Sequence, residues 1–369
     1  MSTALYPLVP PFIAVVLVFA RLLIDFGYKL GLVDKPNARS SHTAIVPRVG
    51  GISIFYPYIL LGAGLYVAGF DFVVNNAPYW VGLGAIVFLG TLDDRLDLSS
   101  SLKFLVQFAV ATYYVLNSGN YVDNLYGLFG IGAIPAWLGI SLSIVTVVYL
   151  INAVNLIDGI DGLAAGTSML SLYLFSTLMG GAEHFFTFAF IGLGLIVFMG
   201  FNFSVNKKIF LGDAGSLGLG FVLATMGMEF LFSGNNHVAN LNLNPIIVAV
   251  LILGYPIADT LRVFILRLSL GKSPFSADRR HMHHVLLDKE FSHFGATTFI
   301  MACIGGIVLL NKTLAPMLDS HLMIIINVAI ILLIHMFVRH RSVQLRIFWR
   351  SFSRGIYKPV KKIWTKYVT

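Results

Sequence analysis

The chain has 369 residues, of which 57% are hydrophobic and 11% are charged, and its mean hydropathy is +0.83. Soluble domains contain about 25% charged residues, so this composition excludes an ordinary soluble protein and indicates an integral membrane protein. The formal net charge of +8 is then expected at a membrane surface beside anionic lipids, and no nucleic-acid partner is expected.

Apolar segments suited to crossing a bilayer recur along the whole chain. They predict an all-α, polytopic helical bundle of about eleven transmembrane helices, with no segment polar and long enough for a separate soluble domain. The sequence therefore divides into one membrane domain, residues 1–338, and a short tail, residues 339–369. The predicted spans are residues 4–23, 49–68, 79–92, 102–118, 134–151, 163–180, 185–203, 215–233, 244–264, 297–311 and 321–338.

The distribution of lysine and arginine predicts the orientation of this bundle. Lys312 is the only one of the 25 Lys and Arg residues in an even-numbered connection; the others lie in odd-numbered connections, at span ends or in the tail. Because basic residues collect on the cytoplasmic side, we expect the N-terminus outside the cytoplasm and the C-terminus inside it. The basic tail, with its interleaved Trp and Phe, is expected to lie along the inner leaflet.

Three acidic residues follow the third predicted span. Asp93, Asp94 and Asp97 end a helix, and positions 93 and 97 are one turn apart on the same face. Carboxylates this close repel one another unless a divalent cation or a proton compensates their charge. The pattern alone fits both prenyl-diphosphate chemistry and phosphosugar transfer, and a solvated helix end is the alternative that involves no site.

A second set of polar side chains follows the fifth span. Asn155, Asp158 and Asp161 are spaced three residues apart and so share one helical face. An amide and two carboxylates supply hard oxygen ligands that suit Mg²⁺, which usually keeps waters and substrate phosphates in its shell. Asp213, at the start of the eighth span, adds another carboxylate, either as a metal ligand or as a helix N-cap.

A further polar segment follows the ninth span and contains Arg279, His281, His283 and His284. The spacing of these histidines does not match the usual zinc patterns, whereas arginine and imidazole are good donors to phosphate oxygens. Arg267, just upstream, either joins them or extends its charged end to the membrane surface.

All of these polar segments follow odd-numbered spans, so we expect them to meet at one membrane face, the cytoplasmic one. Carboxylates that converge at an interface favour an enzyme. An ion-coupled transporter, the alternative that is not an enzyme, is expected to hold charged or helix-breaking residues near mid-span and to carry an internal repeat, and the sequence has no convincing repeat.

The ordered set of motifs resembles the polyprenyl-phosphate N-acetylhexosamine-1-phosphate transferases, which are of the glycosyltransferase family 4 type. The resemblance covers residues 31–284 and includes the segments VDKPNARSSHTAIVPRVGG, LDDRLD, NLIDGIDG, FLGDAGS and SPFSADRRHMHH. It is closest to the bacterial branch that uses UDP-N-acetylglucosamine. Met282 interrupts the three consecutive histidines typical of the branch that uses UDP-N-acetylmuramoyl-pentapeptide.

The resemblance implies a reaction and a role for each motif. N-acetylglucosamine-1-phosphate would pass to undecaprenyl phosphate with release of UMP, at the bacterial inner membrane, as the first step of O-antigen or enterobacterial common antigen synthesis. The cofactor would be Mg²⁺, with Mn²⁺ as a substitute. The implied roles are catalysis by Asp93 and Asp94 beside the lipid phosphate, metal binding by Asn155 and Asp213, and substrate binding by Asp34, Asp97, Asp158, Asp161, Arg267, Arg279, His281, His283 and His284.

Several alternatives stay open at this point. They are a transferase for the pentapeptide donor, an aspartate-rich membrane prenyltransferase and an ion-coupled transporter. A prenyltransferase leaves the GDAGS and HMHH segments unexplained. The sequence does not decide between direct attack by the lipid phosphate and a covalent aspartyl intermediate, nor whether the protein forms a homodimer.

Overall fold

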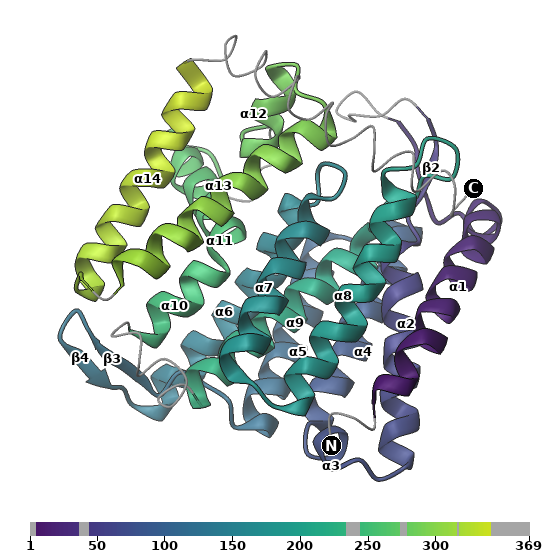
Figure 1. Ribbon diagram of the computed structural model, residues 1–369, viewed down its shortest axis with the longest axis horizontal. Coiled ribbons are helices and arrows are strands. Elements are labelled where there is room, and N and C mark those ends of the chain that lie inside the picture. The colour runs from purple at the N-terminus through teal and green to yellow at the C-terminus, as the bar shows by residue number, and fades with distance from the viewer. Residues whose placement is uncertain (1–4, 37–43, 234–243, 274–278, 316, 341–369) are drawn as a thin grey trace.

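In the part of the chain that the structure describes, the fold is a bundle of helices with two short two-stranded sheets (Figure 1). The computed structural model describes residues 5–36, 44–233, 244–273, 279–315 and 317–340, so most of the predicted tail and part of the SPFSADRR segment lie outside the described residues. The elements are η2 (Tyr6–Leu8), α1 (Val9–Leu30), β1 (Val33–Asp34), β2 (Val46–Pro47), α2 (Gly50–Val67), α3 (Asp71–Val74), α4 (Ala77–Leu96), α5 (Ser100–Ser118), β3 (Asn124–Leu128), β4 (Ile131–Ala133), α6 (Ala136–Ile157), α7 (Leu163–Met179), α8 (Ala182–Asn202), α9 (Gly212–Ser233), α10 (Pro245–Ile252), α11 (Gly254–Ser269), α12 (Met282–Asp288), α13 (His293–Leu314) and α14 (Ser320–His340).

The all-α, polytopic prediction is confirmed, and every predicted span overlaps a helix. Length and apolar composition alone assign fewer crossings. Among the described residues, seven helices are long and apolar enough to cross a membrane, or eight if the bent pair α10 and α11 forms one broken span. The count of eleven spans and the orientation of the termini therefore stay predictions.

The ninth predicted span, residues 244–264, is wrong as a continuous helix. It is divided into α10 and α11, which are bent by 83° relative to each other. Pro256 has no N–H to donate to the carbonyl of Ile252, and this carbonyl instead accepts a hydrogen bond of 2.8 Å from Ser171 Oγ on α7. A neighbouring helix thus satisfies the freed backbone group, as a break inside a membrane requires.

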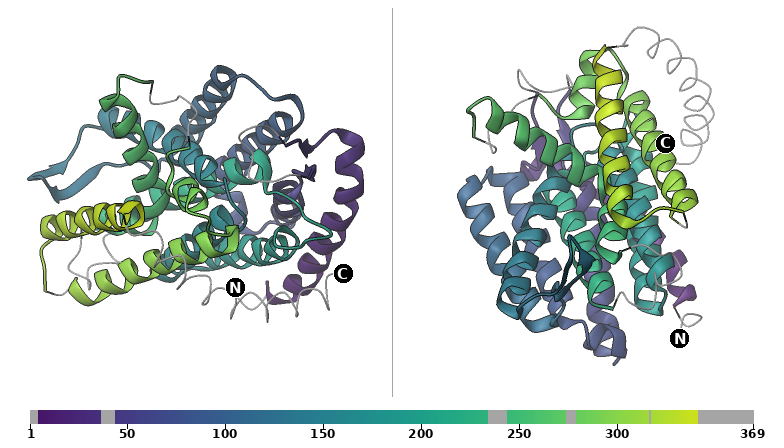
Figure 2. Two further views of the ribbon diagram at one scale, coloured as in Figure 1. Left: turned by 90° about the horizontal axis from the view of Figure 1, so that it is seen from above. Right: turned by 90° about the vertical axis from the view of Figure 1, so that its left-hand side faces the viewer.

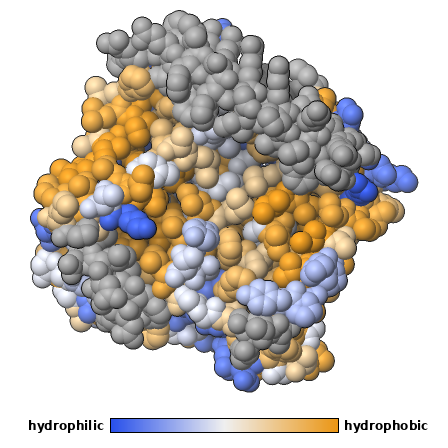
Figure 3. Space-filling model, viewed as in Figure 1, coloured by the Kyte–Doolittle hydropathy of each residue, from blue (hydrophilic) through white to orange (hydrophobic). Residues whose placement is uncertain are grey.

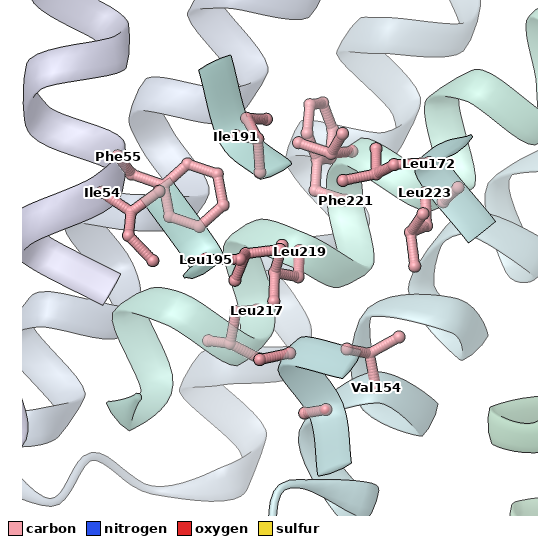
Figure 4. Close-up of a cluster of buried hydrophobic side chains, with 14 of the residues drawn as sticks. Ile54, Phe55, Val154, Leu172, Ile191, Leu195, Leu217, Leu219, Phe221 and Leu223 are labelled. Atoms are coloured by element: carbon pink, nitrogen blue, oxygen red, sulfur yellow. The ribbon is translucent and has the colours of Figure 1, made fainter. Parts of the chain in front are cut away.

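Helix α9 lies at the centre of the bundle. In its most apolar stretch 89% of the residues are buried, against 17% in the corresponding stretches of α1 and α14. Side chains on all sides of α9 meet other helices: Figure 4 shows Leu217 and Phe221 among residues of α2, α6, α7 and α8. A helix that is hydrophobic all round is expected in such a position.

Close packing around α9 depends on glycine. A Cβ at Gly90 of α4 would lie 2.5 Å from the Cα and N atoms of Ala214, and a Cβ at Gly220 would lie 2.6 Å from the Cα of Ile151 on α6. Both contacts are with backbone, which cannot move aside as a side chain can. The two glycines therefore let α4 and α6 approach α9 closely, and this brings the polar ends of the three helices together.

The outer surface of the bundle is largely apolar. Helices α1 and α14 lie on opposite flanks (Figure 2), and Figure 3 shows extensive hydrophobic areas on the face between them. On α14, Leu333 and Phe337 are exposed. Such a surface suits contact with lipid chains rather than water. Figure 1 places β2, the connection after α6, and α12 at one end of the bundle, called the site end below, and α3, β3 and β4 at the other.

Gly90→Ala is expected to destabilise the protein, because the new methyl group meets the backbone of α9 and the two helices must separate. The expected loss of unfolding free energy is about 1–3 kcal/mol, measured as a lower midpoint of thermal unfolding in detergent. Gly84→Ala on the same helix is the matched control, since a Cβ there meets no atom within 4 Å. Equal midpoints for the two variants would contradict the packing argument.

Candidate active site

Asp94 holds the start of α9 against the end of α4. Its two carboxylate oxygens accept hydrogen bonds from the backbone N–H groups of Asp213 and Ala214, at 2.9 and 3.0 Å. Gly212 has a φ of +74°, and a Cβ there would lie 2.6 Å from Asp94 Oδ2, so glycine permits this approach. Asp94 therefore acts as an N-cap supplied by another helix, in favourable alignment with the dipole of α9.

Asp93, the other predicted catalytic carboxylate, has side-chain and backbone partners outside α9 as well as Asp213. It is buried, accepts a hydrogen bond of 2.8 Å from the N–H of Leu98, and pairs with Lys103 Nζ of α5 at 2.6 Å. Its carboxyl group also lies within hydrogen-bonding range of Asp213. Two carboxyl groups in contact require a shared proton or a cation between them, so this pair is a position where positive charge is needed.

Asn155 and Asp213, the predicted metal ligands, lie in contact. The end of α6 and the start of α9 bring Asn155 Nδ2 within 2.6 Å of Asp213 Oδ1 and 2.9 Å of Ser216 Oγ. The prediction that motifs far apart in the sequence converge agrees with this contact. The metal role itself stays a prediction, since a hydrogen bond between the two side chains does not identify a ligand.

Asp158 and Asp161 lie in the connection between α6 and α7 and have opposite electrostatic environments. Burial, together with the charges of Asp213 and Asp161, raises the pKa of Asp158 to about 8. Burial also disfavours the charge of Asp161, but hydrogen bonds and charge from His293 and Lys208 outweigh it and hold the pKa of Asp161 below its usual value. Asp161 pairs with Lys208 Nζ at 2.5 Å and with His293 Nδ1 at 3.2 Å.

Asp34 is connected to the other acids by its partner Arg48, which also interacts with the charges of Asp94 and Asp213. The two form an ion pair of 2.6 Å across the small sheet of β1 and β2. Burial disfavours the charge of Arg48, but the carboxylates of Asp34, Asp94 and Asp213 outweigh this effect and raise the pKa of Arg48. The chain after Arg48 is fixed to the chain before α9, because the N–H groups of residues 50 and 51 donate to the carbonyls of residues 210 and 211.

The histidine segment reaches the same region. A Cβ at Gly159 would lie 2.2 Å from His283 Nε2, so the His283 ring rests directly against the connection that carries Asp158 and Asp161. Burial, with the neighbouring His284 next in importance, lowers the pKa of His283 to about 3. The ring is therefore neutral near pH 7. Within the described residues neither of its nitrogen atoms has a hydrogen-bond partner.

Three further predicted substrate contacts lie at helix ends or in the connection before α12. Asp97 is exposed at the C-cap of α4, in the left-handed conformation with φ of 51°. Arg279 pairs with Asp288 at 2.9 Å, and both side chains are substantially exposed. Arg267 is buried in the last turn of α11.

Sequence reasoning did not single out the cations that face the carboxylates. Arg48 lies within the segment VDKPNARSSHTAIVPRVGG, whose pattern alone gives this arginine no role. Lys103, Lys208 and His293 lie in separate elements and form no local pattern with their partners. The sequence contained one general indication: adjacent acids near a membrane need compensating charge, and basic residues near the ends of the apolar segments were candidates.

The donor set fits a Mg²⁺ ion better than zinc. Within the part of the chain that the structure describes, no three His, Cys, Asp or Glu side chains are arranged to hold one metal ion. Zinc sites normally need at least three such ligands, whereas Mg²⁺ is often held by one or two carboxylates together with waters and substrate phosphates. Asp213, with Asn155 and Asp93 beside it, supplies oxygen atoms of that kind.

These features define a class: a polytopic membrane protein with carboxylate, amide and cationic side chains gathered at one end of the bundle. Comparison with known proteins gives the family. Residues 77–231 match the model of glycosyl transferase family 4. The chain is 32% identical over 287 residues to a probable undecaprenyl-phosphate N-acetylglucosaminyl 1-phosphate transferase of Bacillus subtilis, a match that covers 75% of this chain and 76% of that protein.

Two further relatives agree. The undecaprenyl-phosphate alpha-N-acetylglucosaminyl 1-phosphate transferase of Escherichia coli O157:H7 is 32% identical over 294 residues, covering 76% of this chain and 75% of its own. The protein of the same name from Yersinia pestis is 31% identical over 277 residues and 72% of each chain. This chain belongs to glycosyl transferase family 4.

Asp158→Asn is expected to change how stability depends on pH in the ligand-free protein. Because the pKa of Asp158 is raised to about 8, its contribution to stability is fully present below the pKa of about 4 in the unfolded chain and is lost as the pH rises through about 8. The variant does not lose stability in this way. The difference between its thermal unfolding midpoint and that of wild type should therefore rise with pH. Asp71→Asn, at an exposed position in α3, is the control. Parallel curves for Asp158→Asn and wild type would contradict the assignment.

Proposed function

We propose that this protein transfers N-acetylglucosamine-1-phosphate from UDP-N-acetylglucosamine to undecaprenyl phosphate and releases UMP. The names of its relatives describe the transfer of N-acetylglucosaminyl 1-phosphate with undecaprenyl phosphate as a substrate. The observation in the structure that carries the proposal is the meeting of Asp93, Asn155 and Asp213 at the ends of three helices, with Arg48 and Lys103 beside them.

The reaction requires two anions to meet. The lipid phosphate and the nucleotide diphosphate repel each other, so the site must supply positive charge and phosphate donors. Arg48, Lys103 and Lys208 supply charge around the carboxylates. His283, neutral and buried, is a hydrogen-bonding group that adds no repulsion toward the metal.

A bound Mg²⁺ would neutralise the diphosphate and stabilise the charge that develops on the leaving UMP. We propose that Asp213 and Asn155 hold it. In this proposal Asp93 accepts a proton from the lipid phosphate, and Lys103, which pairs with Asp93, holds that phosphate nearby. The phosphorus–oxygen bond to UMP breaks while a lipid oxygen bonds to the same phosphorus, so the anomeric centre is untouched.

Asp94 takes a different role in this proposal from the one the family resemblance implies. Since both of its oxygens accept backbone N–H groups, it holds α9 in place, and Asp93 is left as the proton acceptor. We also propose that the site end faces the cytoplasm of a bacterial inner membrane, on the distribution of Lys and Arg.

The test is a release assay on purified protein with UDP-N-acetylglucosamine, undecaprenyl phosphate and Mg²⁺. We expect UMP and a lipid-linked sugar diphosphate, formed only when both the lipid and the metal are present. Release of UDP would mean that the glycosidic bond is broken and would overturn the proposed reaction. Turnover only with UDP-N-acetylmuramoyl-pentapeptide would show that this molecule is the donor. If no donor gave any turnover, the ion-coupled transporter would be favoured.

Asp213→Asn is expected to lower kcat by at least about 100-fold and to raise the Mg²⁺ concentration needed for half-maximal rate. The amide keeps the shape of the side chain and its contact with Asn155 but removes the charge. Asp71→Asn is the matched control at the far end of the bundle and should turn over normally. A variant with unchanged Mg²⁺ dependence would show that Asp213 is not a ligand.

A further inference from the structure

Asp259 is a buried carboxylate on α11 that the proposed reaction leaves unused. Its Oδ2 lies 2.9 Å from His281 Nδ1, and its Oδ1 accepts the backbone N–H of Met282 at 3.1 Å. Only 5% of Asp259 and 3% of His281 are exposed, so both groups need partners in the interior. Asp259 thus fixes one ring and the backbone at the start of α12.

Arg262, one turn along α11, completes the attachment. It donates to Asp259 Oδ1 at 2.7 Å and to the carbonyl of Arg280 at 2.8 Å. Residues three apart lie on the same face of a helix, where an acid and a base can pair. Both side chains also bind the residues at and before the start of α12. A buried ion pair with this many additional hydrogen bonds has a defined geometry.

The contact with Asp259 determines how His281 presents its other nitrogen. A carboxylate at Nδ1 keeps the proton on that atom and orients the ring, as in carboxylate–histidine pairs at other sites. Nε2 is then the atom left for a ligand, and within the described residues this buried atom has no hydrogen-bond partner.

His281 belongs to the same site as the carboxylates. Its ring stacks on that of His283, with centroids 5.8 Å apart and an angle of 14° between the planes. His283 in turn rests against Gly159. A shift of His281 would therefore be passed to His283 and to the connection that carries Asp158 and Asp161.

We propose that Asp259 is a positioning residue for the transfer reaction, which holds His281 so that Nε2 contacts the diphosphate of the nucleotide sugar. This inference rests on the proposed function. Asp259 touches no substrate itself; it acts through His281, and Arg262 fixes the carboxylate in the required orientation. The bend between α10 and α11 places Asp259 for this contact.

The test compares Asp259→Asn, His281→Asn and the double variant in the UMP-release assay. Asp259→Asn should lower kcat by about 10- to 100-fold and leave the KM for undecaprenyl phosphate within about twofold. His281→Asn keeps a donor at the Nδ1 position but has no Nε2, so it should stay folded and lose a similar or larger factor. The double variant should be no slower than His281→Asn, because both changes remove one function. Asp259→Glu should recover part of the rate.

Thermal unfolding separates this role from a structural one. If Asp259 only stabilises the fold, Asp259→Asn lowers the unfolding midpoint and leaves kcat of the folded fraction at the wild-type value, which would overturn the inference. Losses in kcat that multiply in the double variant would also overturn it, since the two residues would then act separately. Asp71→Asn is the control for the change of charge.

A second readout does not need turnover. UDP-N-acetylglucosamine with Mg²⁺ should raise the unfolding midpoint of wild type, and this rise should be reduced equally in Asp259→Asn, His281→Asn and the double variant. If wild type releases no UMP, the proposed function fails. The increase in unfolding midpoint caused by the ligand then still tests the inference. An equally reduced increase in the three variants supports it, and an increase in Asp259→Asn as large as in wild type contradicts it.

Discussion

The site depends on the buried N-terminus of α9. A helix begins with backbone N–H groups that have no partner within the helix, and burying them unpaired is costly. Asp94 of α4 satisfies two of them, and Gly90 and Gly212 leave room for α4 and its carboxylate to approach. The same contact places Asp213, the first acid of α9, beside Asp93 at the end of α4. One capping interaction thus stabilises the bundle and fixes the distance between two carboxylates.

Charge compensation is the second constraint on this end of the molecule. Buried carboxylates are stable only with paired charge, protonation or a metal ion. In this structure different acids are stabilised in different ways. Asp93 has Lys103 and Asp161 has Lys208, whereas Asp158 is held with a raised pKa. Each cation belongs to a different segment of the chain from its acid, so the balance exists only in the folded chain. An anionic substrate would enter a site whose cations are already oriented by carboxylates, and it would compete with them for the same donors.

The sequence predicted the helices and the convergence of the motifs, because apolar segments of membrane length and polar residues at their ends are local patterns. It predicted a continuous ninth span because Pro256 lies within an apolar run, and a bend depends on whether a neighbour can satisfy the freed carbonyl. Ser171, which donates to this carbonyl of Ile252, is 81 positions away in the chain. The difference between Asp93 and Asp94, to which sequence reasoning assigned the same role, was equally hidden: adjacent acids are alike in sequence, and only the path of α9 determines which one caps it. Lys208 and Arg48 were missed for the same reason, since their partners are distant in the chain.

Helix α6 connects the two halves of the candidate site. At its end Asn155 contacts Asp213, and two turns earlier the hydroxyl of Tyr149 donates a hydrogen bond of 2.9 Å to the carbonyl of Ile257. That carbonyl lies two residues before Asp259, so the carboxylate that holds His281 is positioned from the same helix as Asn155, the amide proposed as a metal ligand. A broken helix has more freedom of orientation than a continuous one, and this bond to α6 removes part of that freedom. The bend between α10 and α11 can therefore place a buried carboxylate beside the histidines while the distance to Asn155 is still set by a continuous, well-packed helix.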